Sequence, residues 1–166
     1  MVQVHVVALA VDSRSQPVVL LKPISDKPGS GKILPIWIGS QEATSILIAT
    51  EGGSAGRPLT HDLMKSLLEA VQAELERVDV THIEGGTYFA KLTLHTRDGR
   101  LVLDARPSDA IALAARVDAP IWVNDDLLEA AGVDDETAVA GSPGEEELVD
   151  EFTQFLEHVD PEDFQG

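Results

Sequence analysis

The sequence contains no cysteine, which excludes disulfide bonds, thiolate metal sites and a cysteine nucleophile. Aromatic residues make up only 4% of the 166 residues, so a core must be built mainly from Val, Ile, Leu and Ala. No apolar run is long enough to cross a bilayer, and the first residues lack the basic stretch that opens a signal peptide. From these absences we expect a cytoplasmic protein that does not contact a membrane.

Basic residues are also scarce: 12 Lys and Arg stand against 29 Asp and Glu, for a formal net charge of −17. This balance argues against a protein that grips nucleic acid through a broad basic surface. The excess is uneven, because residues 134–166 hold 12 of the acids and no basic residue, which leaves 17 acids against 12 basic residues in residues 1–133. The acid run is typical of a solvated segment, although it could also mimic nucleic acid.

The composition changes after Gly132 and divides the chain into three parts. Residues 1–133 are long enough to form a domain with its own core. Residues 134–147 are rich in Gly, Pro and acids and predict a linker. Residues 148–166 place apolar side chains at helical spacing and predict a C-terminal amphipathic helix, whose apolar face must dock on the body, on another subunit or on a partner.

Alternating apolar residues and turn signals predict an α+β fold, with a mixed or antiparallel sheet of about six to seven strands packed with three to four helices. The longest helix is expected to run from Leu63 to Val78, with an apolar stripe that belongs to the core. Ser40, Ser108 and Asn124 are expected to cap three other helices. Strands are expected near residues 2–11, 17–22, 33–39, 80–83, 88–95, 101–106 and 120–123.

The stretch Asp104–Ala114 gathers charged and polar groups at a helix start. Pro107 ends a strand, Ser108 and Asp109 begin a helix, and Arg106 lies beside them. A helix N-terminus can hold an anion, and an adjacent arginine gives two-pronged recognition of phosphate or carboxylate. The same residues also fit ordinary capping with a structural ion pair, and the local pattern alone favours that structural interpretation.

A related order of residues occurs earlier, where Arg57 and Pro58 precede Thr60 and Asp62. Both places have Arg-Pro, then Ser or Thr, then Asp in the expected first helical turn. Two similar helix starts could face one cleft, or could solve the same capping problem twice. Sequence alone favours the second alternative.

Several motifs follow one another in order along the chain: Pro35–Gly39 with Glu42–Ala43, Arg57–Leu63, Tyr88–Ala90, Asp104–Ala114 and Pro120–Ile121. This ordered set resembles the bifunctional nuclease domain family and runs through most of residues 1–133. Residues 152–164 are similar to the C-terminal extension of bacterial members. The resemblance implies a compact, oligomeric α+β domain with nuclease activity on DNA and RNA.

Phosphodiester cleavage needs a positioned nucleophile, neutralisation of charge on the phosphate and help for the leaving oxygen, and this sequence offers groups for each. The candidate catalytic residues are Asp104, Asp109, Asp62 and His61, the last as acid or base near neutral pH. The candidate phosphate-binding residues are Arg57, Arg106, Ser108 and Thr60. The candidate ligands for Mg or Mn are Glu42, Asp62 and Asp109.

Three functions are compatible with these residues. The first is a nuclease of low sequence specificity, assisted by a divalent metal, that associates with itself and acts on DNA and RNA. The second is a non-catalytic regulatory or assembly domain whose Arg-Pro turns are structural, and the third is a sensor for a small phosphorylated ligand. A nuclease needs Arg57, Arg106 and at least two carboxylates open to one groove, whereas an assembly domain would bury them and a sensor would enclose them in a pocket.

Overall fold

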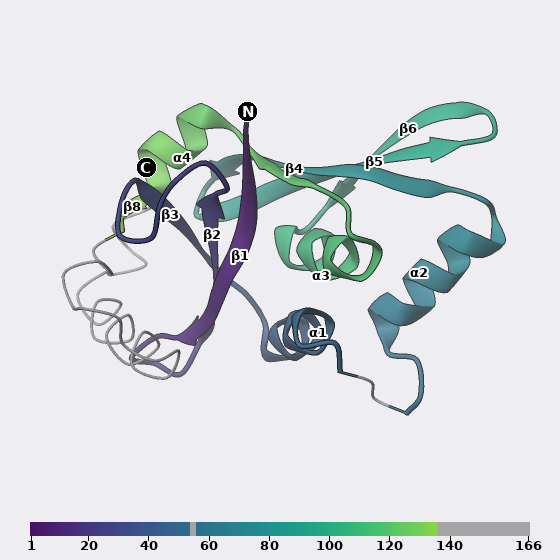
Figure 1. Ribbon diagram of the computed structural model, residues 1–166, viewed down its shortest axis with the longest axis horizontal. Helices are drawn as coiled ribbons and strands as arrows, with labels where there is room; N and C mark the ends of the chain where they lie inside the picture. Colours follow the sequence, from purple (N-terminus) through teal and green to yellow (C-terminus); the bar gives the residue numbers. More distant parts are fainter. Residues whose placement is uncertain (54–55, 136–166) are drawn as a thin grey trace.

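The computed structural model describes residues 1–53 and 56–135, and within them it has an α+β fold (Figure 1). One mixed sheet has the strand order β6-β5-β4-β7-β1-β2-β3-β8. The strands are β1 (Val2–Val11), β2 (Pro17–Pro23), β3 (Lys32–Trp37), β4 (Glu74–Glu84), β5 (Thr87–Thr96), β6 (Gly99–Ala105), β7 (Ile121–Val123) and β8 (Val133–Asp134). The helices are α1 (Ser40–Thr50), α2 (Thr60–Ala70), α3 (Pro107–Val117) and α4 (Asp125–Ala131). The predicted fold class is confirmed, with β8 as an additional short strand.

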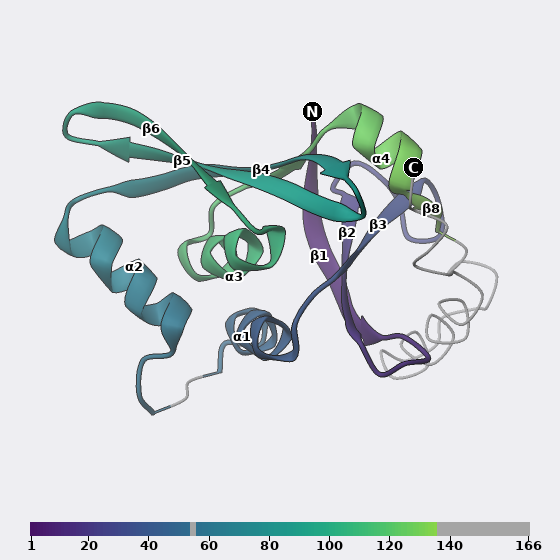
Figure 2. The ribbon, with the colours of Figure 1, turned by 180° about the vertical axis from the view of Figure 1, so that it is seen from behind.

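Helix α3 occupies the centre of the molecule. Figures 1 and 2 show α1, α2 and α3 on one side of the strands β4, β5 and β6, with α3 between the sheet and α1. The consecutive residues Ala110–Ala114 are all buried, because α3 packs against the sheet and against both other helices. The three alanines in this run let these elements approach α3 closely.

Strand β7 joins two antiparallel parts of the sheet. On one side it runs parallel to β4, which continues into β5 and β6 as a meander. On the other side it runs antiparallel to β1, which continues into β2 and β3. The main buried cluster takes side chains from both parts and from the helices, and a second, smaller cluster of Ala10, Val18, Leu20 and Ile33 lies on β1, β2 and β3.

The prediction of a long helix from Leu63 to Val78 is wrong. Helix α2 ends at Ala70, Gln72 adopts a left-handed backbone conformation with φ of 56°, and β4 begins at Glu74. Val78 and other β-branched residues of this segment favour a strand, which pairs with both β5 and β7. The predicted stripe is therefore divided between a helix and a strand.

The part of that stripe on α2 does not belong to the core. Leu63, Leu67 and Val71 are 55%, 56% and 64% exposed, whereas Leu75 and Val78 on β4 are buried. Met64 and Leu68 are the α2 side chains that pack against the core. An apolar row is thus left on the outer face of α2.

Two of the three expected helix caps are also wrong. Helix α1 begins one residue earlier than a Ser40 cap requires and α3 two residues earlier than a Ser108 cap requires, with Gly39 and Arg106 at the N-cap and no side-chain capping hydrogen bond. Proline has no N–H to satisfy and fits the first helical position, so Ser108 lies inside α3. The third prediction is confirmed, because the side chain of Asn124 accepts a 3.0 Å hydrogen bond from the backbone N–H of Asp126.

The described chain ends in contact with the body. Strand β8 pairs with the start of β3, and the buried carboxylate of Asp135 pairs with Lys22 and accepts a 2.8 Å hydrogen bond from Gly29 N. The rest of the predicted linker and the predicted helix over 148–166 lie outside the described residues. None of the described helices is long and apolar enough to cross a membrane.

Candidate functional site

A pocket of about 510 Å³ opens where three helices begin. Helices α1, α2 and α3 each contribute their N-terminal turns, so backbone N–H groups and the positive ends of three helix dipoles lie around one space. The lining residues are Ser40, Gln41, Glu42, Thr44 and Ser45 from α1, Leu59, Thr60 and His61 from the start of α2, and Arg106 and Asp109 from the start of α3. Such a place suits an anion.

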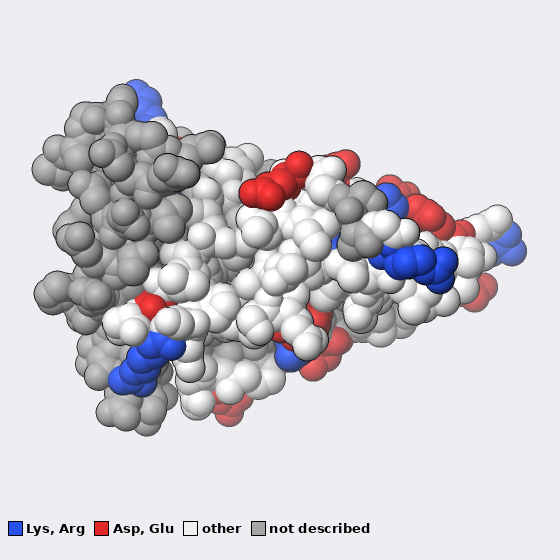
Figure 3. Space-filling model, turned by 90° about the horizontal axis from the view of Figure 1, so that it is seen from below, with Lys and Arg blue, Asp and Glu red and all other residues white. Residues whose placement is uncertain are grey.

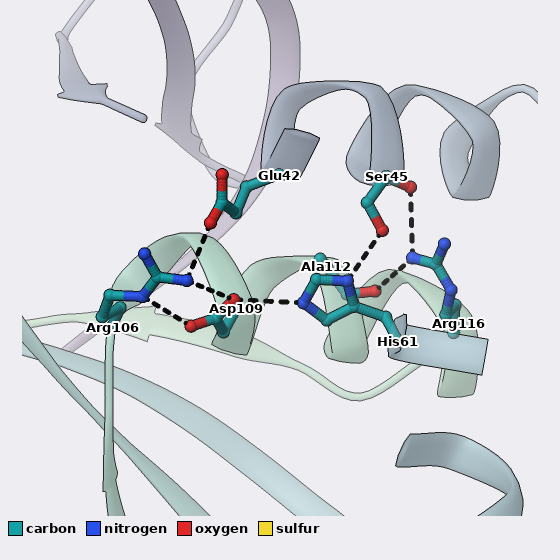
Figure 4. A network of polar contacts seen from close by, with 7 residues as sticks. All are labelled: Glu42, Ser45, His61, Arg106, Asp109, Ala112 and Arg116. Atoms are coloured by element: carbon teal, nitrogen blue, oxygen red, sulfur yellow. Dashed lines mark hydrogen bonds and ion pairs between the residues drawn. The ribbon is translucent and has the colours of Figure 1, made fainter. Parts of the chain in front are cut away.

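Arg106 bridges two carboxylates at the mouth of this pocket (Figure 4). Its Nε donates to Asp109 Oδ2 at 2.7 Å, and its Nη2 donates to Asp109 Oδ1 at 3.1 Å and to Glu42 Oε1 at 2.7 Å. Hydrogen bonds first with Asp109 and then with Glu42 raise the pKa of Arg106 above its ordinary value. The Arg106 side chain is nevertheless 66% exposed, and its Nη1 has no hydrogen-bond partner among the described residues.

His61 lies deeper and links α1 to α3. Its Nε2 is 3.2 Å from Asp109 Oδ1, and its Nδ1 is 2.8 Å from the hydroxyl of Ser45. A carboxylate can only accept, so Nε2 carries the proton in the neutral ring and Nδ1 accepts from Ser45 Oγ. Ser45, His61 and Asp109 thus form a chain of hydrogen bonds along which a proton can move (Figure 4).

Arg116 holds the three helices together beneath the pocket. It is 5% exposed, and its Nη1 donates to the backbone oxygens of Ser45 (3.1 Å) and Ala112 (2.8 Å). Its Nε donates to Asp62 Oδ1 at 2.6 Å, and the other Asp62 oxygen accepts from Leu59 N at 2.8 Å. Within the described part of the chain, Arg116 Nη2 is the buried side-chain atom that lacks a partner.

The face that carries the helices has no continuous basic surface. Figure 3 shows Lys and Arg side chains on it separated by acids and by uncharged surface. This agrees with the low content of basic residues. This charge pattern favours a local anion contact, such as Arg106 and the helix N-termini offer, over a broad basic one.

The structure brings part of the predicted site together. Glu42, Thr60, His61, Arg106 and Asp109 line the same pocket, although they come from three helices. The single-groove condition for a nuclease is met only in part: Arg106 shares the pocket with the carboxylates of Glu42 and Asp109, which are 17% and 28% exposed, but Arg57 does not line it.

Four other predicted site residues lie elsewhere. Asp62 faces Arg116, Ser108 is buried within α3, and Arg57 is exposed before α2 and does not line the pocket. Asp104 is exposed on β6 opposite Lys91, without an ion pair to any residue that the structure describes. Their proposed roles in catalysis or phosphate binding stay predictions.

Two residues that bond the predicted site residues were not predicted from the sequence. Ser45 lies in the middle of α1 and Arg116 in the last turn of α3, and neither belongs to a recognisable motif. Arg116 also fits an ordinary interaction with the helix dipole. Only the packing of three helices shows that Ser45 meets His61 and that Arg116 meets Asp62.

The carboxylates of Glu42 and Asp109 are the candidate ligands of a divalent metal in this pocket. Glu42 and Asp109 both accept hydrogen bonds from Nη2 of Arg106, so the two carboxylates face one common cationic group. No group of three or more His, Cys, Asp or Glu that could hold a metal occurs in residues 1–53 and 56–135. Two carboxylates fit Mg, which often binds proteins through one or two carboxylates together with water and substrate phosphate.

Replacing Asp62 with asparagine is expected to weaken the fold more at neutral pH than in acid. The hydrogen bond from Arg116, followed by that from the Leu59 N–H, lowers the pKa of Asp62 below its ordinary value of 3.8. A lowered pKa in the folded state stabilises it fully above the unfolded pKa, and this contribution is lost as the pH falls through the folded pKa. Urea unfolding at pH 7 and at pH 3 measures the difference in the free energy of unfolding between the wild type and the variant at each pH.

The control for this experiment is Asp98→Asn, because Asp98 is exposed in the β5–β6 turn and its carboxylate has no described partner. This variant should follow the wild type at both pH values. An Asp62→Asn deficit that is as large at pH 3 as at pH 7 would show that the ionised carboxylate does not stabilise the fold.

The structure is that of an α+β protein with a polar pocket at three helix N-termini, in which Ser45, His61 and Asp109 are linked by hydrogen bonds. Residues 19–136 match the model of the bifunctional nuclease domain. The chain therefore belongs to the bifunctional nuclease domain family, as its motifs indicated.

Relatives of two kinds are similar to this chain. The Uncharacterized protein Rv1829 of Mycobacterium tuberculosis is 37% identical over 168 residues, which cover 99% of this chain and 98% of that protein. Bifunctional nuclease 1 of Arabidopsis thaliana is 30% identical over 125 residues, or 74% of this chain. Bifunctional nuclease 2 of Oryza sativa subsp. japonica is 29% identical over 127 residues, also 74% of this chain. The match spans 38% of the length of either plant protein.

Proposed function

We propose that this protein is a nuclease that hydrolyses phosphodiester bonds of DNA and RNA with low sequence specificity. The observation that carries the proposal is the pocket in which an exposed arginine and a Ser-His-Asp chain meet at three helix N-termini. Membership of the family and the similarity to plant proteins named bifunctional nucleases support the same reaction class.

Arg106 is the group that would contact the scissile phosphate. Its exposed guanidinium offers Nη1 to an incoming oxygen while Nε and Nη2 stay bonded to Asp109. Without Arg106, the carboxylates of Glu42 and Asp109 would repel a phosphodiester at this place. Arg106 therefore makes the pocket acceptable to a phosphate and stabilises the charge that builds up on its oxygens during attack.

The chain of Ser45, His61 and Asp109 would remove the proton from the attacking water. As the water oxygen bonds to phosphorus, its proton passes to Ser45 Oγ and the Ser45 hydroxyl proton passes to His61 Nδ1. Asp109 stabilises the imidazolium that forms, because it already accepts from Nε2. The bond from phosphorus to the leaving sugar oxygen breaks, and the proton returns along the chain to that oxygen.

Three further features belong to the proposal. Mg or Mn would be held by Glu42 and Asp109 and would supply positive charge at the phosphate oxygens. The location in the cytoplasm is a prediction. Self-association of the chain is also part of the proposal, and the exposed apolar residues of the edge strand β6 support it.

The test is an assay of the full chain on labelled single-stranded DNA and RNA, with Mg, with Mn and with a chelator. Arg106→Gln should lower the cleavage rate about 100-fold, because it removes one group that stabilises the transition-state charge. Arg97→Gln is the matched control, since Arg97 is an exposed arginine of the β5–β6 turn that bonds Gln72 outside the pocket. The chelator should abolish cleavage by the wild type.

Cleavage that persists equally in Arg106→Gln would locate the activity outside this pocket or in a contaminant. Absence of cleavage in the wild type under all metal conditions would favour the regulatory or assembly function. Both variants must show the wild-type unfolding transition in urea, so that a lost activity reports on the pocket and not on folding.

A further inference from the structure

Strand β6 carries an exposed apolar run at the edge of the sheet. Leu101, Val102 and Leu103 are 47%, 55% and 40% exposed, and β6 is the first strand in the sheet order. Figures 1 and 2 show the end of the β5–β6 hairpin projecting beyond α3. Natural edge strands are normally protected against pairing by charges, proline or a covering element. Three consecutive exposed apolar residues on an edge strand therefore indicate a binding surface.

The outer side of β6 offers backbone groups for such pairing. In the β5–β6 hairpin the pair next to the two-residue turn is Thr96 and Gly99. The two residues of such a pair donate to and accept from each other, so both of their backbone hydrogen bonds join β5 to β6. Alternate residues then point their N–H and C=O groups at β5. The groups of Arg100, Val102 and Asp104 therefore point away from the sheet, where no described strand pairs with them.

The sequence of β6 is complementary to itself about Val102. When two copies pair antiparallel with Val102 opposite Val102, Leu101 lies opposite Leu103, and Arg100 lies opposite Asp104 in both directions. This register also places the outward-facing backbone groups directly opposite one another. In this register an opposite-charge pair lies at each end of the paired segment and apolar residues lie between them. A shift of the register by two residues would separate the charges.

We propose that β6 pairs with β6 of a second copy of this chain, so that two sheets join into one continuous sheet across a two-fold axis at Val102. Arg100 is 68% exposed and uses its Nε and Nη2 for Glu76, which leaves further guanidinium donors for the Asp104 of the second copy. Asp104, which has no described ion pair within its own chain, gains one in the dimer.

The same axis accounts for the apolar row on α2, formed by Leu63, Leu67 and Val71. A two-fold axis through an antiparallel strand pair is perpendicular to the sheet, so both copies of α2 lie on the same face of the joined sheet. Figure 1 shows α2 at the same end of the molecule as the β5–β6 hairpin. Stable interfaces bury about 800 Å² per partner, more than one short strand provides, and the α2 row supplies additional apolar area.

The test exploits the charge pairs. Analytical ultracentrifugation of the full chain should show a wild-type dimer. Arg100→Asp and Asp104→Arg each place like charges opposite one another twice per dimer, and each should weaken self-association about 10- to 100-fold. An equimolar mixture of the two variants restores both opposite-charge pairs, so it should form a heterodimer with nearly the wild-type affinity.

Recovery in the mixture is specific for a two-fold pairing of these two positions, since a general loss of structure would not be repaired by mixing. Each variant is first checked for the wild-type unfolding transition. A wild-type chain that is monomeric at 100-fold dilution and at high concentration alike would overturn the proposal, as would another segment of the chain covering β6. Two single variants that dimerise as well as the wild type would overturn it equally.

Discussion

Replacing His61 with alanine is expected to lower the cleavage rate by about 10²- to 10⁴-fold, the usual contribution of a general base. In the proposed reaction the proton of the attacking water reaches His61 through Ser45, and no other described side chain lies within hydrogen-bond distance of Ser45 Oγ. Removing the imidazole leaves Arg106 and the helix N-termini to bind phosphate. Substrate binding should therefore change much less than the rate of the chemical step.

Single-turnover cleavage with excess enzyme measures that step directly. Because His61 is buried, the alanine variant leaves a cavity, so His61→Gln is the second variant: it keeps most of the volume and can hydrogen-bond to both neighbours, but it cannot act as a base. His5→Ala is the control, since His5 is exposed on β1 and does not line the pocket. A folded His61→Gln enzyme with the wild-type rate would refute the role of His61.

Much of this pocket could be predicted from the sequence, because its polar residues stand at recognisable helix starts. Arg106 and Asp109 are three residues apart, so their ion pair is a local property of the first turn of α3. Glu42 is 64 residues away from Arg106, and only tertiary packing brings them to 2.7 Å. The local pattern favoured separate capping sites, whereas the fold directs three helix N-termini at one space.

The error over residues 63–78 has a different physical origin. Leu63, Leu67 and Val71 have helical spacing, and Leu75 and Val78 continue it closely enough to suggest one helix. The helix ends because Gln72 adopts a left-handed backbone conformation, and a glutamine in the sequence does not predict such a conformation. Residues after it gain more from pairing on both sides in the sheet than from one more helical turn.

Because residues 63–78 were assigned to one core helix, an exposed apolar row was not predicted. An apolar stripe on an amphipathic helix normally faces the core, and for that reason these α2 residues were predicted to be buried. In the structure Met64 and Leu68 face the core and the stripe of Leu63, Leu67 and Val71 faces outward. The exposed row of Leu63, Leu67 and Val71, at the same end as the exposed β6 run, therefore supports the proposed association and does not stabilise the single chain.

Replacing Arg116 with methionine is expected to reduce the free energy of unfolding by about 2 to 4 kcal/mol. The guanidinium links all three helices of the pocket, through Asp62 on α2, the Ser45 carbonyl on α1 and the Ala112 carbonyl on α3. Methionine retains the apolar volume of the stem and removes these charge-assisted hydrogen bonds. The loss stays below that of a fully buried ion pair, because Asp62 is 37% exposed and can be hydrated.

Urea unfolding at pH 7 measures this change, and thermal unfolding should show a midpoint about 5 to 15 °C lower for a domain of this size. Arg97→Met is the control, because its exposed side chain should contribute less than about 0.5 kcal/mol. Arg116→Lys should recover only part of the loss, since one ammonium group cannot reproduce the planar fork that reaches three helices. If Arg116→Met were as stable as the wild type, the three helix starts would be held together by α3 packing alone, and the geometry of Ser45 and His61 would not depend on Arg116.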